Sequence, residues 1–248
     1  KDTTFKNVYV FPKPTPAFSI NDTFQCLRGN SFVFTNSSSI SSGTLNYLWR
    51  FSSIVNDTST QANATKQYTA GNTYQVKLMT TSNRGCKDSL TKQVIVNPNI
   101  AGNKIKTPQS ICAGAQPQKL ISDSTIIGGN NTYSYQWQSS TDSISWSNLS
   151  GATSSDYLPP SLSITTWYRR IIASGDCSDT SNIVKIVVTP GVTNNSITAP
   201  QADCQGFTPS KLTGTIPIGG TSSFNYQWES SSDSITWSTI QSATDSTY

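Results

Sequence analysis

Short runs of β-branched and aromatic residues, separated by turn-forming residues, recur along the whole chain. Each run is too short for the 3.6-residue apolar period of an amphipathic helix, and Gly, Pro, Asn or Ser soon interrupts it. Thr, Val, Ile, Tyr and Trp suit a pleated surface on which every second side chain faces the core. The pattern therefore predicts an all-β protein with few helices.

Two internal repeats divide the chain into domains. Residues 1–12, KDTTFKNVYVFP, reappear as residues 87–98, KDSLTKQVIVNP. Both copies end in an apolar strand that stops at a proline, as a closing strand does. We therefore interpret residues 1–12 as the last strand of a preceding domain, and we expect the chain to continue upstream.

The second repeat lies in the other half of the chain. Residues 133–147, YSYQWQSSTDSISWS, reappear as residues 224–238, FNYQWESSSDSITWS. Tyr248 corresponds to Tyr157, so we expect the last two strands of this copy to lie beyond the chain. The predicted layout is a terminal strand (1–12), complete domains at 13–98 and 99–190, and a truncated domain at 191–248.

Each complete domain has the length and strand spacing of an immunoglobulin-like β-sandwich. We predict two sandwiches of the seven-strand antiparallel class, stacked end to end, because short proline-bearing linkers favour a semi-rigid rod. In such a sandwich a tryptophan on the third strand packs across the core, and Trp49, Trp137 and Trp228 hold that place. Arg169 and Arg170 alternate across a strand, so one of them should face solvent.

Composition and charge exclude several functions. Only 12% of residues are charged, the formal net charge is +4, and there is no histidine to serve as a catalytic base. Glu229 is the only glutamate, and its repeat partner is Gln138. Scattered basic residues give no nucleic-acid footprint, and no apolar run is long enough to span a membrane. We expect no enzyme activity, no cofactor, no metal site and no membrane insertion.

Five widely spaced cysteines without CxxC motifs indicate structural disulfides in an extracellular compartment. The default prediction pairs them within domains, Cys26 with Cys86 and Cys112 with Cys177. In an ideal immunoglobulin sandwich these loops lie at opposite poles, which leaves a bond between neighbouring domains, such as Cys26 to Cys177, as the alternative. We expect the partner of Cys204 to lie beyond Tyr248.

Residues 13–98 resemble a polycystic-kidney-disease (PKD) domain. The resemblance rests on FSI at 18–20, FVFTNSS at 32–38, YLWRF at 47–51, YTAGNTYQVKL at 68–78 and NRGCKDS at 83–89. Ser52 stands where this family usually begins Gly-Asp-Gly, so the usual tight turn is not expected here.

Residues 99–248 resemble the immunoglobulin-like repeats of giant surface proteins of the phylum Bacteroidota. The matching segments are YQWQSS, the DSIxW hairpin, GAT at 151–153 and TWYRR at 166–170. The combination is similar to type IX-secreted adhesins such as the gliding-motility adhesin. This resemblance implies a secreted, cell-surface protein in adhesion or motility.

The same resemblance suggests a modification. Nine of the twelve aspartates precede Ser or Thr, and six of these pairs continue with an aliphatic residue or Thr. The pattern is similar to the O-glycosylation motif of Bacteroidota, although Asp-Ser and Asp-Thr also favour turns. The candidate acceptors are Thr3, Ser89, Ser124, Ser143, Ser234 and Ser246.

Three functions remain. The first is a structural spacer, or stalk, in an adhesin, whose partners are the neighbouring repeats. The second is a set of glycan-binding modules that recognise surface polysaccharide through Trp146 and Trp237, although covering the sheet is the simpler role for both. The third is an accessory region of a secreted polysaccharide-degrading enzyme. Other cell-surface proteins are possible partners, and a fully buried Trp146 would rule out the glycan site.

Overall fold

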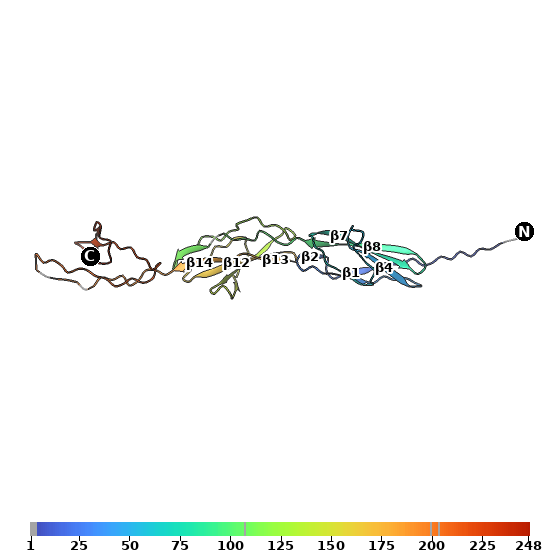
Figure 1. Ribbon diagram of the computed structural model, residues 1–248, viewed down its shortest axis with the longest axis horizontal. Helices are drawn as coiled ribbons and strands as arrows, with labels where there is room; N and C mark the ends of the chain where they lie inside the picture. Colours follow the sequence, from blue (N-terminus) through green and yellow to red (C-terminus); the bar gives the residue numbers. More distant parts are fainter. Residues whose placement is uncertain (1–3, 107, 199, 203) are drawn as a thin grey trace.

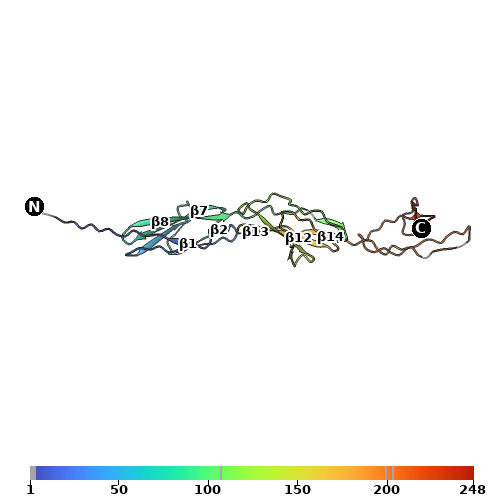
Figure 2. The ribbon, with the colours of Figure 1, turned by 180° about the vertical axis from the view of Figure 1, so that it is seen from behind.

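The computed structural model describes residues 4–106, 108–198, 200–202 and 204–248. Figure 1 shows an elongated molecule, with the first sandwich, the second sandwich and the C-terminal segment following one another along its length. The view from behind in Figure 2 shows the same row. No helix occurs among the described residues. The predicted all-β fold with end-to-end stacking is confirmed.

The first sandwich consists of two facing sheets in strand orders β1-β3-β6 and β2-β8-β7-β4-β5. Its strands are β1 (Phe18–Ile20), β2 (Phe24–Cys26), β3 (Phe32–Asn36), β4 (Leu45–Arg50), β5 (Thr58–Ser59), β6 (Ala64–Lys66), β7 (Asn72–Ser82) and β8 (Lys87–Asn97).

Alternating side chains from both sheets fill the core between them. Six aromatic rings carry most of this core: Phe18, Phe32, Phe34, Trp49, Phe51 and Tyr68. Trp49 is fully buried and donates its indole N–H to the carbonyl of Gln61 at 2.9 Å. Tyr74 donates its hydroxyl to the carbonyl of Ala70 at 3.0 Å, as in a tyrosine corner. The predicted core role of Trp49 is confirmed.

One pair of strands departs from the antiparallel arrangement that we predicted. The chain leaves β1 in one sheet, crosses at residues 21–23 and joins the other sheet as β2. Since β2 keeps its direction while changing sheets, it runs parallel to β8, and Cys26 pairs with Asn97. This crossing covers one edge of β8 and ties the two layers together.

The second sandwich has one well-formed sheet, in strand order β11-β10-β12-β14-β9, with β13 also pairing with β12. Here too one pair is parallel, β9 with β14. Among the described residues, three isolated bridges stand in place of a continuous opposite sheet: Ala101 with Ile127, Ile105 with Ser122, and Leu120 with Tyr157. The strands are β9 (Gln109–Cys112), β10 (Ser134–Ser140), β11 (Ser147–Asn148), β12 (Thr166–Ser174), β13 (Cys177–Thr180) and β14 (Val184–Thr189).

Strand β12 alternates buried and half-buried positions without a break, and Arg170 falls on its buried side. The side chain of Arg170 is 0% exposed and packs near the rings of Tyr135 and Trp137. Its guanidinium donates to Asn103 Oδ1 at 3.0 and 3.1 Å and to Ser122 Oγ at 2.8 Å. Trp137 is fully buried beside it, as predicted.

Residues 191–248, the C-terminal segment, repeat the first half of the second sandwich. They hold β15 (Glu229–Ser230) and β16 (Ser238–Thr239), which pair as β10 and β11 do. Trp228 donates to the carbonyl of Asp245 at 2.9 Å, as Trp137 does to that of Ser154. By the sequence repeat, residues 191–248 correspond to the part of the second sandwich that precedes β12, and Trp228 is only half-buried.

At the other end of the molecule, residues 4–12 form no strand and are largely exposed. Phe11 nevertheless contacts the β7–β8 hairpin, where the guanidinium of Arg84 lies 5.1 Å from its ring centre. The neighbouring Lys13 forms an ion pair with Asp88 at 3.1 Å. The interpretation of residues 1–12 as a closing strand stays a prediction, and residues 1–3 lie outside the described part.

Candidate functional site: the junction between the sandwiches

The linker between the two sandwiches is hydrogen-bonded to both of them. On the side of the first sandwich, the carbonyl of Asn97 accepts a hydrogen bond from the amide of Leu27 at 2.8 Å. The side chain of Asn99 accepts from the amide of Arg28 at 2.9 Å. Toward the second sandwich, the carbonyl of Pro98 accepts from the amide of Gly129 at 2.8 Å. The linker is therefore part of the folded structure and not a free hinge.

A Gly-Gly turn makes this close approach possible. Gly128 and Gly129 have φ values of 91° and 64°, a region that side chains rarely adopt. A Cβ on Gly128 would lie 2.1 Å from the carbonyl oxygen of Asn99, and one on Gly129 would lie 2.2 Å from Ser174 Oγ. Only glycine allows the turn to sit against both the linker and the end of β12.

A disulfide between Cys26 and Cys177 crosses the junction. The default pairing of Cys26 with Cys86, and of Cys112 with Cys177, is therefore wrong, and the bond between neighbouring domains is confirmed. Strand β8 explains the difference. It starts just after Cys86 and ends beside Cys26, so the two cysteines lie about 35 Å apart at ~3.3 Å per residue.

The other three cysteines differ in their surroundings. Cys86 is a half-buried free thiol and Cys112 an exposed one. Cys204 is exposed. Around the disulfide, a small apolar cluster of Ile100, Ile172 and Cys177 is buried against Cys26 and Tyr133. Apolar contact, hydrogen bonds and a covalent bond thus all hold the junction in one geometry.

The proposed glycan platforms occur on matching hairpins but differ in exposure. Trp146 is half-buried, with the guanidinium of Arg169 4.2 Å from its ring centre. Arg169 also donates to Gln138 Oε1 at 2.7 Å, across the strand pair. Trp237 is 57% exposed. One face of Trp146 is therefore occupied by a side chain of its own domain, while Trp237 remains open.

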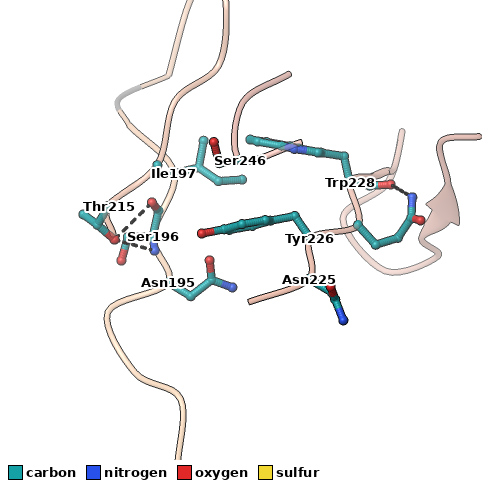
Figure 3. A pocket seen from close by; sticks show the side chains of 10 residues that line it. Asn195, Ser196, Ile197, Thr215, Asn225, Tyr226, Trp228 and Ser246 are labelled. Atoms are coloured by element: carbon teal, nitrogen blue, oxygen red, sulfur yellow. Dashed lines mark hydrogen bonds between the residues drawn. The ribbon is translucent and has the colours of Figure 1, made fainter. Parts of the chain in front are cut away.

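A cavity of about 350 Å³ lies in the C-terminal segment, between residues 195–197 and the rings of Tyr226 and Trp228 (Figure 3). By the repeat, Asn195, Tyr226 and Trp228 match Asn103, Tyr135 and Trp137, which surround Arg170 in the second sandwich. The cavity is thus the place that an arginine of β12 fills one repeat earlier. We interpret it as the interior of a repeat and not as a ligand cleft.

The aspartates of the Asp-Ser motifs on the hairpins have a structural role. Asp142 Oδ1 accepts from the amides of Ile144 at 2.8 Å and Ser145 at 2.7 Å, and from Ser140 Oγ at 2.8 Å. These hydrogen bonds to the carboxylate hold the pKa of Asp142 well below its usual range. Asp233 repeats the arrangement with Ile235, Thr236 and Ser231.

The hydroxyl groups of the candidate acceptors are mostly accessible. Ser89, Ser124, Ser234 and Ser246 are exposed, and Ser143 is half-buried. The hydroxyl of Ser124 donates to the carbonyl of Gly102 at 2.8 Å. Thr3 lies outside the described residues. Glycosylation at these positions stays a prediction.

Within the described ranges, no group of three or more His, Cys, Asp or Glu residues could hold a metal ion. Among the same residues, no helix is long and apolar enough to cross a membrane.

Comparison with protein families supports the two kinds of module. Residues 101–190 and 193–248 match the model of a "Domain of unknown function (DUF8696)". The chain belongs to this family. Residues 13–97, ahead of the DUF8696 repeats, match the PKD domain. No curated protein sequence matches the chain.

Two kinds of solved structure are similar to parts of this chain. The PKD1 domain of the Vibrio cholerae metalloprotease PrtV is 31% identical, over 35% of this chain and 98% of that one, with a TM-score of 0.29. A variant of a three-domain immunoglobulin fragment of titin is 13% identical, over 95% and 83% of the two chains, with a TM-score of 0.55. The titin fragment shows a tandem immunoglobulin fold, and at this identity it shows nothing further. PKD and immunoglobulin-like domains are structural modules, and a disulfide is typical of secreted proteins.

Two features of the structure were not predicted from the sequence. Full burial of Arg170 was not expected, because arginine is almost never fully buried. Its signal was the alternation of β12, which places Arg170 on the same face as Tyr168 and Ile172. Nor did any motif indicate Asn99 as the residue that fastens the linker. A single asparagine beside a proline looks like an ordinary turn residue.

Proposed function

We propose that this chain is a spacer segment of a large secreted cell-surface adhesin of the type IX-secreted kind, acting in surface adhesion or gliding motility. The observation that carries this proposal is the junction, where the Cys26–Cys177 bond and a bonded linker join two sandwiches into one elongated unit. A protein whose task is to hold a distant binding site at a set reach needs this property. A ligand-binding region does not need it.

The surroundings of the other candidate sites support the same role. The junction residues bond to one another. The cavity of Figure 3 corresponds to a core position, and Trp146 is covered on one face by Arg169. In this proposal the chain is not an enzyme, and its partners are the neighbouring repeats. Glycans on Ser89, Ser143 and Ser234 would add hydration to a rod with few charges.

Replacement of the segment in the full-length protein tests the spacer role. In the native host, residues 13–190 are exchanged for two unrelated sandwiches of equal length joined by a rigid linker. In a second strain the same residues are deleted. A spacer predicts that adhesion or motility survives the exchange and weakens on deletion. Loss of function in the exchanged strain, with normal export, would contradict the proposal and favour a binding role.

Glycan binding is the second candidate, and the 57% exposure of Trp237 is the observation that favours it. An exposed indole can stack on the apolar face of a sugar ring. The test is binding of the chain to a panel of bacterial and algal polysaccharides. A glycan platform predicts that Trp237→Ala abolishes binding while Phe24→Ala, also at an exposed aromatic residue, does not.

A further inference from the structure

The bonded junction has a geometry that can be sought elsewhere in the chain. Cys26 is the last residue of β2, which runs parallel to the closing strand of its own sandwich, and it pairs there with Asn97. Cys177 is the first residue of β13, after a tight turn at Gly175. Its Sγ lies 3.8 Å from the carbonyl oxygen of Asn97 and 3.4 Å from that of Pro98. One cysteine thus comes from a strand end, the other from a hairpin.

Cys112 occupies in the second sandwich the place that Cys26 has in the first. It is the last residue of β9, which runs parallel to the closing strand β14, and it pairs with Thr189. The residue after the cysteine also makes the same hydrogen bond in both sandwiches. Ala113 donates its amide to the carbonyl of Thr189 at 2.9 Å, as Leu27 donates to that of Asn97. Cys112 therefore stands at the downstream end of its sandwich as a strand-end cysteine without its hairpin partner.

Cys86 occupies in the first sandwich the place that Cys177 has in the second. It follows Gly85, which has a φ of 84°, in the β7–β8 hairpin. Its Sγ lies 3.9 Å from the carbonyl oxygen of Phe11. Phe11 and Pro12 are the sequence counterparts of Asn97 and Pro98 in the first repeat. The Cys86 thiol therefore faces its upstream linker as the Cys177 sulfur faces the linker between the sandwiches.

The backbone fastening of the junction also recurs downstream. Gly220 donates to the carbonyl of Pro190 at 2.9 Å, as Gly129 donates to that of Pro98. A Cβ on Gly219 would lie 2.1 Å from the carbonyl oxygen of Gly191, which is the same close approach as at Gly128. The next junction is thus built like the bonded one, and it has Cys112 on its upstream side.

We infer that each junction in this row of repeats carries one disulfide between neighbours, so that Cys86 is bonded to a strand-end cysteine of the preceding repeat and Cys112 to a hairpin cysteine of the following one. This inference rests on the proposed function, which takes the chain as part of a longer row. The result is a ladder of covalent links in which every repeat is bonded to both of its neighbours.

Each bond forms by thiol–disulfide exchange with an extracytoplasmic thiol–disulfide oxidoreductase in its disulfide form. One repeat thiolate attacks the enzyme disulfide and displaces one of its sulfurs as a thiolate. The second repeat thiolate then attacks the mixed disulfide and displaces the enzyme's other sulfur. Two cysteine thiols lose two protons and two electrons, and the enzyme is reduced to its dithiol.

Disulfide mapping of the full-length protein tests the ladder. Protein is isolated from its source with iodoacetamide present throughout, digested without reduction and analysed by mass spectrometry. We expect a Cys86 peptide joined to a peptide of the preceding repeat, and a Cys112 peptide joined to one of the following repeat. The Cys26–Cys177 peptide pair is the internal control.

Three results would overturn the inference: carbamidomethylated Cys86 and Cys112, bonds within their own repeats, or bonds to another copy of the protein. An upstream sequence without a cysteine at the matching strand end would do the same for Cys86. Small-angle scattering of the same preparation measures whether the molecule is elongated, and so distinguishes failure of the disulfide inference from failure of the spacer proposal. Free thiols in a molecule that is still elongated leave the spacer standing.

Discussion

The two sandwiches share a frame and differ in what fills it. Trp49 and Trp137 occupy equivalent strands, β4 and β10, and each donates its indole N–H to a carbonyl at 2.9 Å. The first core is then completed by tilted and edge-on aromatic rings around Phe34. The second is completed by the guanidinium of Arg170. A common backbone plan therefore tolerates an apolar or a polar centre.

The two domains also differ in the second layer. In the first sandwich, β1, β3 and β6 form a ladder that satisfies their own backbone groups. In the second, the described residues of the facing layer form only isolated bridges. Arg170 supplies hydrogen bonds there, to Asn103, Ser122 and the carbonyl of Ser155. Buried polar groups cost free energy unless they are paired, so the arginine pairs two side chains and one backbone carbonyl of this layer.

The largest effect should come from opening the aromatic core. Phe34→Ala removes a fully buried ring whose centre lies 5.6 Å from those of Trp49 and Phe51. We expect the free energy of unfolding of the first sandwich to fall by about 4 kcal/mol. Hydrogen exchange measured by mass spectrometry on peptides of β7 and β12 reports the two sandwiches separately. Phe24→Ala is the matched control, because Phe24 is 52% exposed. An equal loss in both variants would contradict the assigned core.

The second prediction concerns the polar centre. Arg170→Met keeps most of the side-chain volume but leaves Asn103 and the carbonyl of Ser155 without their donor. An unsatisfied buried acceptor is costly, so the second sandwich should lose about 2 kcal/mol, again measured by hydrogen exchange. Arg169→Met, one residue away and half-buried, should cost less than ~1 kcal/mol. If Arg170→Met is as stable as the wild-type chain, the hydrogen bonds of the arginine do not stabilise this core.

The smallest effect should come from the Asp142 carboxylate in the β10–β11 hairpin, and it should depend on pH. Because hydrogen bonds lower the pKa of folded Asp142, its contribution is fully present above about pH 4, the usual range of a carboxyl group. It is lost as the pH falls through the lower pKa of the folded protein. Asp142→Ala should therefore lower the melting temperature at pH 7, and the deficit should narrow toward pH 2. A deficit that is constant with pH would mean that the carboxylate charge has no part in it.

Much of the frame could be predicted from the sequence, because repeats and alternation report local geometry. The strand positions of Trp49 and Trp137 follow from such patterns, and so does the end-to-end order of the domains. From the sequence the disulfide could be named only as an alternative, since spacing along the chain does not by itself say at which pole a cysteine emerges. That depended on the crossing at residues 21–23, which carries Cys26 to the far end of β8.

The junction bond also determines which parts of the molecule would bear a load. If the two ends are pulled apart, tension reaches Cys26, passes through the disulfide to Cys177 and leaves along β13 and β14. The 151-residue interval between the two cysteines is bypassed. About 500 Å of extended chain, at roughly 3.3–3.6 Å per residue, cannot be pulled out by force until the bond is reduced. The oxidised molecule would therefore extend only through the residues outside this interval, and the interval itself would become extensible on reduction.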